Sequence, residues 1–191
     1  MSRRAMQIVW FKRDLRVADH APLEQASKQG QCLCLYVYEP ELIESPEFDT
    51  SHLKFINESL AELDVALQAI GGQLTYRIGP MPEVLEKLHL QCGIDVIWSH
   101  QETGNRITLE RNQRVRRWVK EMGLEWNEIA QHGVVRGLKS RDGWAAHWNT
   151  SMSRPLAQRP SQIVAGTRVE TGAPATPEQL GLDPSEKTEL Q

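Results

Sequence analysis

The sequence predicts an α/β protein built on a doubly wound, five-stranded parallel sheet. Short apolar runs alternate with amphipathic stretches, and the links between them are short. An apolar run bounded by turn residues is typical of a strand that is buried on both faces of a parallel sheet. Right-handed crossovers then give a three-layer α/β/α arrangement, Rossmann-like or flavodoxin-like, with the strand order 3-2-1-4-5.

The predicted strands all lie in the first 130 residues of the chain. They cover residues 7–11, 32–38, 73–78, 94–98 and 124–129. The first of them, Gln-Ile-Val-Trp-Phe, is followed at once by the charged run Lys-Arg-Asp-Leu-Arg. We therefore expect a central strand whose charged end lies where open α/β sheets bind their ligands.

The predicted helices lie between these strands. Asp19 is a plausible N-cap for the first. The clearest periodic signal is a stripe at spacings of three and four: Leu53, Ile56, Leu60, Leu63, Leu67 and Ile70. We expect this stripe to pack on the sheet, with a partner-binding face as the alternative. A basic helix at about 107–122 follows the fourth strand, and we expect Arg111 and its other basic residues to form mostly a solvated face.

Composition excludes several classes of protein. The formal charge of −3 gives no general signal for binding polyanions. Cys32, Cys34 and Cys92 fit reduced core thiols, because no second Cys/His pair stands at zinc-ligand spacing. No membrane span or signal peptide is visible, so we expect a cytoplasmic location.

The last third of the chain differs in composition. Residues 131–148 hold several glycines together with Trp144 and Trp148, and we expect loops and a short helix packed against the domain. From about residue 154 the chain is rich in Pro and Gly, as linkers are. We therefore predict an α/β domain at 1–150 and an interdomain linker or tail at 151–191.

The usual nucleotide and hydrolase motifs are missing. There is no Gly-x-Gly-x-x-Gly after the first strand, no P-loop and no Gly-x-Ser-x-Gly. Two polar clusters remain, at 12–16 and 99–103, and the predicted strand order places them across one crevice. Such a crevice suits a polar, partly anionic, heteroaromatic ligand. Alternatively, Arg13 and Asp14 form an internal ion pair that only shapes the turn.

The run from Trp10 to Leu23 resembles the opening of the photolyase/cryptochrome family. That opening has Trp-Phe, two basic residues, Asp-Leu-Arg and then Asp-(Asn/His)-x-x-Leu. The similarity extends to about residue 160, through segments 38–40, 59–63, 79–85, 98–105 and 114–115. The segment 99–105 departs from the Glu-Pro-Tyr type of sequence that is common in photolyases, and it resembles a less typical bacterial subgroup.

The resemblance implies an N-terminal antenna domain whose crevice holds a folate, a deazaflavin or FMN. The residues expected to rim it are Lys12, Arg13, Tyr38, Glu39, His100 and Glu102. The resemblance also implies that FAD and damaged DNA bind to a C-terminal helical domain, which this chain lacks. We therefore expect a fragment of a photolyase or cryptochrome-like flavoprotein that has no catalytic residues and no metal site of its own.

Two other functions stay open at this point. The second hypothesis is a structural docking module that has lost its chromophore, with Trp144 and Trp148 as contact residues. A stand-alone nucleotide-binding enzyme is the third hypothesis, although both glycine motifs are missing. An acid–base pair of His100 and Glu102 has no accompanying nucleophile or metal set.

Overall fold

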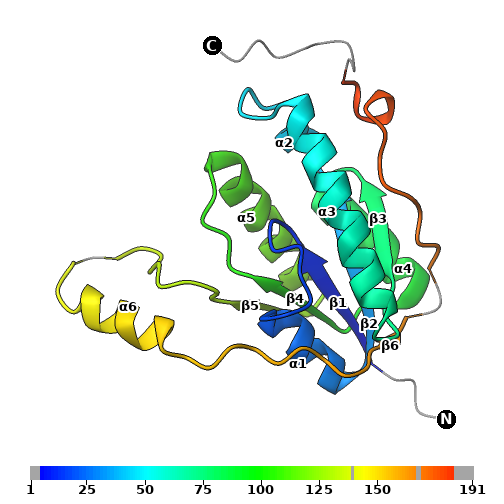
Figure 1. The fold of residues 1–191 in the computed structure, drawn as a ribbon. Coiled ribbons are helices and arrows are strands. Elements are labelled where there is room, and N and C mark those ends of the chain that lie inside the picture. Colours follow the sequence, from blue (N-terminus) through cyan, green and yellow to red (C-terminus); the bar gives the residue numbers. More distant parts are fainter. Residues whose placement is uncertain (1–4, 139, 167–168, 183–191) are drawn as a thin grey trace.

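The central sheet of the computed structural model is parallel and lies between two layers of helices (Figure 1). The structure describes residues 5–138, 140–166 and 169–182. The strands are β1 (Met6–Phe11), β2 (Gln31–Tyr38), β3 (Leu74–Ile78), β4 (Val96–His100) and β5 (Glu125–Ile129). Their order, β3-β2-β1-β4-β5, confirms the predicted topology.

The fourth strand lies two residues later than predicted. Ile94 is buried but precedes the strand, and pairing with β5 continues to His100, which lies opposite Ile129. Ser99 and His100 are therefore strand residues, and their side chains project to opposite faces of the sheet. This register places the His100 ring on the face that also carries the start of the first helix.

The helices between the strands cover both faces of the sheet. They are α1 (Ala21–Gln29), α3 (Thr50–Gln68), α4 (Met81–Cys92) and α5 (Arg106–Glu121). The shorter helices are α2 (Pro40–Ile43), α6 (Trp144–Met152) and the 3-10 helix η1 (Glu178–Leu180). His20, rather than the expected Asp19, caps α1, because its Nδ1 accepts the Leu23 amide 3.1 Å away.

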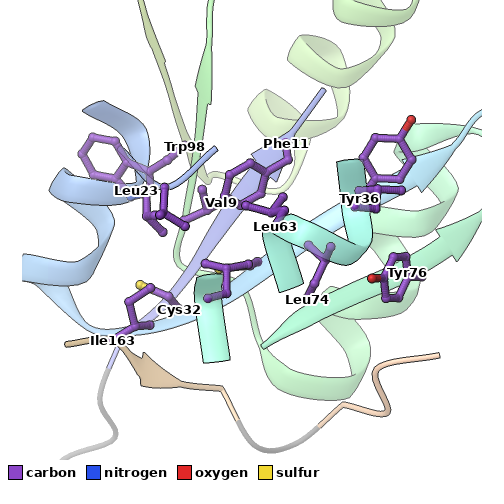
Figure 2. Packing of buried hydrophobic residues seen from close by; sticks show 14 of the residues in the cluster. Val9, Phe11, Leu23, Cys32, Tyr36, Leu63, Leu74, Tyr76, Trp98 and Ile163 are labelled. Carbon is purple, nitrogen blue, oxygen red and sulfur yellow. The ribbon is translucent and has the colours of Figure 1, made fainter. Parts of the chain in front are cut away.

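Alternating residues of β1 send their side chains into two separate cores. Val9 and Phe11 pack with α1 and α3, where Leu23 and Leu63 lie over the sheet (Figure 2). Ile8 and Trp10 pack on the other face with α4 and α5. The predicted stripe on α3 is thus a packing face.

The three cysteines are buried free thiols, and burial raises the pKa of Cys32 to about 12.

The segment predicted to be a linker or tail lies partly on the domain. Ile163 and Ala175 are 2% exposed and belong to the core with α1 and α3. A short unpredicted strand, β6 (Val164–Ala165), pairs in parallel with Gln31 and Cys32 of β2. Its apolar residues are too few to give a periodic signal. Residues 167–168 and 183–191 of the predicted tail lie outside the described part of the chain.

Helix α6 departs from the expectation that residues 131–148 pack on the domain. It stands away from the sheet (Figure 1), and all of its residues, each of which the structure describes, are at least partly exposed. Trp144 and Trp148 are each 43% exposed.

In the described part of the chain, no helix combines the length and the apolar character needed to cross a membrane.

Candidate chromophore site

A cavity of about 700 Å³ opens where β1 and β2 end, at the carboxyl edge of the sheet. Its inner wall is formed by Trp10 and Lys12 at the end of β1 and by residues 36–39 at the end of β2. Residues of α2, the α2–α3 loop and the first turns of α3 form the outer wall, among them Phe48 and Phe55. Aromatic walls around a few charged groups are typical of a site for a planar organic ligand.

The inner wall carries two cations stacked on one indole. The Nζ of Lys12 lies 4.3 Å from the centre of the Trp10 ring, and the Arg111 guanidinium carbon lies 4.6 Å from it. Trp126 continues the aromatic surface, with its ring centre 5.8 Å from that of Trp10. Cation–π contacts are strongest where water is excluded, and Trp10 is 1% exposed. This stack fixes the base of the cavity.

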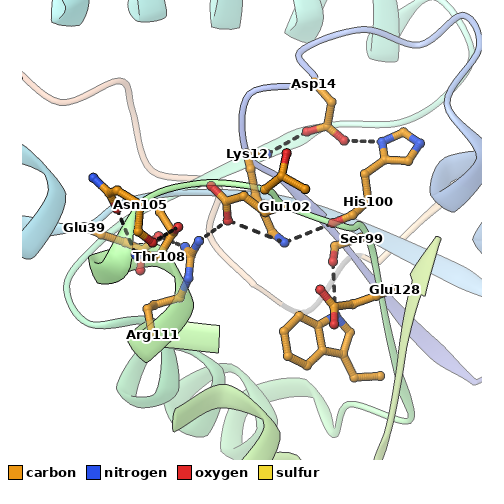
Figure 3. Close-up of polar contacts among 12 residues, drawn as sticks. Lys12, Asp14, Glu39, Ser99, His100, Glu102, Asn105, Thr108, Arg111 and Glu128 are labelled. Atoms are coloured by element: carbon orange, nitrogen blue, oxygen red, sulfur yellow. Dashed lines mark hydrogen bonds and ion pairs between the residues drawn. The ribbon is translucent and has the colours of Figure 1, made fainter. Parts of the chain in front are cut away.

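Arg111 of α5 ties together the ends of two strands. Its guanidinium pairs with Glu39, which follows β2, and with Glu102, which follows β4 (Figure 3). Arg111 is 2% exposed and Glu39 is 7% exposed. Removing one member of such a buried network leaves an uncompensated charge, so the three side chains act as a unit. Lys12 adds a second cation, 3.9 Å from Glu102.

Burial shifts the pKa of two groups in this wall. It lowers the pKa of Lys12 to about 8, although Glu102 opposes the shift. It also raises the pKa of Glu39 to about 7, against the positive charge of Arg111. Both groups therefore titrate close to neutral pH, and the charge of the inner wall depends on pH there.

Behind the inner wall, Asp14 joins two imidazole rings. Its Oδ2 lies 2.5 Å from Nδ1 of His100 and 2.9 Å from Nε2 of His20. Its Oδ1 accepts the Lys12 amide at 2.8 Å. The hydrogen bonds from the two rings hold the pKa of Asp14 well below its usual range despite burial. Asp14 thus contacts two histidines, and among the described residues the alternative ion pair between Arg13 and Asp14 is not formed.

The geometry of Asp14, His20 and His100 resembles a metal site, because their ligand atoms lie within 4.8 Å of one another. The hydrogen bond at the start of α1 argues against a metal ion. Nδ1 of His20 accepts the Leu23 amide, so in the neutral ring the proton sits on Nε2, which faces Asp14. A ring bound in this way has no lone pair for a metal ion.

The predicted site residues fall into two groups. Lys12, Arg13, Tyr38, Glu39 and Glu102 line the cavity. Arg13 is exposed, and the Tyr38 hydroxyl donates to Asn57 at 2.6 Å. His100, the sixth predicted residue, lies behind the wall, with its ring against Asp14 and its carbonyl oxygen 3.1 Å from Nζ of Lys12. It supports the wall rather than rimming the cavity.

Several lining residues were not predicted. Arg111 is buried, although its run of basic residues predicted a mostly solvated face. Phe48, His52 and Asn105 also line the cavity. The usable signal for Arg111 was its position four residues before Val115 and eight before Val119, which aligns it with the buried stripe of α5.

Comparison with known proteins agrees with this architecture. The family model described as DNA photolyase matches residues 7–165. The blue-light photoreceptor PHR2 of Arabidopsis thaliana is 30% identical over 139 residues, which cover 68% of this chain and 31% of that protein. The chain therefore spans about a third of the length of this relative.

Two solved structures share the fold at 20% identity. A cryptochrome of Synechocystis sp. superposes with a TM-score of 0.75 over 94% of this chain and 41% of its own. An archaeal photolyase from Sulfolobus tokodaii, solved with two FAD molecules and described as implying a novel light-harvesting cofactor, has a TM-score of 0.65. That match covers 84% of this chain and 37% of the archaeal protein.

Proposed function

Because the chain belongs to the DNA photolyase family, we propose that its cavity binds an antenna chromophore. The observation that carries the proposal is the cavity of about 700 Å³ at the carboxyl ends of β1 and β2, with Trp10 and Lys12 in its wall. The Sulfolobus tokodaii photolyase, solved with two FAD molecules and described as implying a novel light-harvesting cofactor, is a precedent in a protein of the same fold. A folate, a deazaflavin or FMN are the candidates.

The charges of the cavity favour a particular orientation of the ligand. Arg111 is already paired with Glu39 and Glu102, so the inner wall offers hydrogen-bonding groups with balanced charge. A neutral ring with donors and acceptors on its edge suits that end. Arg13 is exposed at the opening and offers a cation to an anionic substituent, such as a phosphate or a glutamyl group.

Titration of the purified chain with each candidate chromophore tests the proposal. Binding should change the absorption or the fluorescence of one of them. Ser45→Trp fills the outer wall and should weaken binding at least about tenfold, because Ser45 lines the cavity. Ser59→Trp is the matched control, because Ser59 lies in α3 and is not among the residues that line the cavity. If none of the three molecules binds, the chain has no antenna role.

The activity of a longer protein containing this domain is a further part of the proposal. In it, a C-terminal helical domain binds FAD and damaged DNA, and light drives either DNA repair or signalling in the cytoplasm. The present chain alone is then not catalytic. A repair assay on pyrimidine-dimer DNA under blue light should show no turnover by the purified chain, and turnover would contradict the proposal.

A second function is favoured by the surface of α6. Trp144, Trp148 and Met152 recur every four residues and are 43%, 43% and 46% exposed. Residues at this spacing share one face of a helix. This face would suit a docking module that has lost its chromophore. The same titration separates the two functions, since a docking module would bind none of the three candidates.

A further inference from the structure

Lys12 is held at both of its ends by one closed ring of contacts. Its backbone amide donates to Oδ1 of Asp14 at 2.8 Å. Its Nζ donates to the carbonyl oxygen of His100 at 3.1 Å. The ring nitrogen Nδ1 of His100 lies 2.5 Å from Oδ2 of Asp14 and closes the ring (Figure 3). The Lys12 side chain therefore has little freedom to leave the cavity wall.

This ring of contacts is closed off from water. Asp14 and His100 are each 4% exposed, and the Lys12 side chain is 8% exposed. His20, which is fully buried, supports Asp14 from the start of α1. The contacts within a buried polar network hold its members in one geometry. Three separate segments of the chain thus converge on the position of one amine.

The Lys12 amine keeps donors that the protein does not use. An ammonium group has three N–H donors. Among the residues that the structure describes, the His100 carbonyl is the one hydrogen-bond acceptor within reach of Nζ. Glu102 lies 3.9 Å away, beyond hydrogen-bonding distance, and the Trp10 ring covers another side. A molecule in the cavity can therefore accept a hydrogen bond from this amine.

We propose that Asp14 and His100 are positioning residues that hold the Lys12 amine in place to donate a hydrogen bond to the bound chromophore. The identity of the ligand rests on the proposed function, whereas the positioning is a property of the free protein. Asp14 then contributes to binding without touching the ligand. His100 contributes through its carbonyl oxygen and its ring.

The pKa of Lys12 separates positioning from two simpler roles of Asp14. Burial is the main cause of the lowered value of about 8, and the negative charge of Asp14 acts in the opposite direction. If Asp14 acted only as a charge, Asp14→Asn would lower the pKa of Lys12 further. If it only stabilised the turn, the pKa would not change. If it positions the amine, the substitution releases Lys12 into solvent and the pKa rises toward 10.5.

Lysine-labelled protein allows this pKa to be measured by NMR, with Lys12→Met assigning the signal. We expect Asp14→Asn to raise the value, whereas Asp19→Asn, in an exposed acid of the same loop, should leave it unchanged. Should Asp14→Asn prevent folding, His100→Phe removes the ring nitrogen but keeps the carbonyl, and we expect a smaller rise. An unchanged or lowered pKa would overturn the proposal.

A double-mutant cycle with FMN tests the link to the ligand. Asp14→Asn and Lys12→Met should each weaken FMN binding about tenfold, and the double variant should bind no more weakly than Lys12→Met alone. Losses that multiply would mean that Asp14 acts independently of Lys12, against the proposal. If wild-type protein binds no chromophore, the proposed function fails, and the pKa measurement still decides whether Asp14 positions the amine.

Discussion

Glu39 should make the stability of this domain fall as the pH rises. The carboxyl group is 7% exposed, and burial raises its pKa from 4.5 to about 7. The folded protein therefore holds the proton more tightly than the unfolded chain does. The free energy of unfolding is highest below pH 4.5, decreases between pH 4.5 and about 7, and is level above that range as far as Glu39 is concerned.

The size of this effect follows from the two pKa values. One pKa unit corresponds to about 1.4 kcal/mol. Because the pKa of Glu39 is 4.5 in the unfolded chain and about 7 in the folded protein, the free energy of unfolding falls by about 3 kcal/mol across that pH range. Glu39→Gln keeps the size of the side chain and removes the titration. The free energy of unfolding of the variant minus that of wild type should be about 3 kcal/mol larger near pH 8 than near pH 4.5.

Urea denaturation followed by circular dichroism at several pH values measures this difference. Glu41→Gln is the control, because Glu41 is exposed and pairs with Arg114 on the surface, where ion pairs contribute under about 1 kcal/mol. A difference between Glu39→Gln and wild type that does not vary with pH, or that varies in the opposite direction, would refute the reasoning. It would show that the charge of Arg111 outweighs burial at Glu39.

Three further predictions concern the core and the caps. Leu63→Ala should lower the free energy of unfolding by about 2–5 kcal/mol because Leu63 is 2% exposed, whereas Phe55→Ala, at a residue 71% exposed, should cost under about 0.5 kcal/mol in the same urea titration. His20→Ala should lower the free energy of unfolding by about 2–4 kcal/mol, because it removes the cap of α1 and a donor to buried Asp14. His20→Asn should recover the cap, so equal losses in the two variants would contradict a capping role. Ile163→Ala should lower the free energy of unfolding, measured by thermal or urea unfolding, by about 2–4 kcal/mol. A loss under about 0.5 kcal/mol would mean that the segment around Ile163 does not contribute to the core.

Much of the fold could be predicted because it depends on local patterns. The alternation of apolar strands and amphipathic helices fixed the sheet order, and chain connectivity left few alternatives. Lys12, Glu39 and Glu102 could be placed near one another for the same reason, since each follows a strand that ends at one edge of the sheet.

The parts that could not be predicted depend on contacts between distant segments. Arg111 lies in a run of basic residues, and its burial depends on its pairing with Glu102 and with Glu39, which lies 72 residues earlier. His100 was expected in a loop at the rim of the cavity. Because β4 continues to His100, the ring lies against Asp14 instead. A shift of one or two residues at a strand end is enough to change the role of a side chain.

The segment that carries β6 also bears on where the α/β domain ends. β6 pairs with β2, and Ile163 fills the core beneath α3, so the first 150 residues alone leave that surface open. The amide of Tyr76 likewise donates to the Thr171 carbonyl oxygen, 2.7 Å away. A protein cut after residue 150 would lose these contacts, so the stable unit extends beyond the α/β layers into the segment that follows α6.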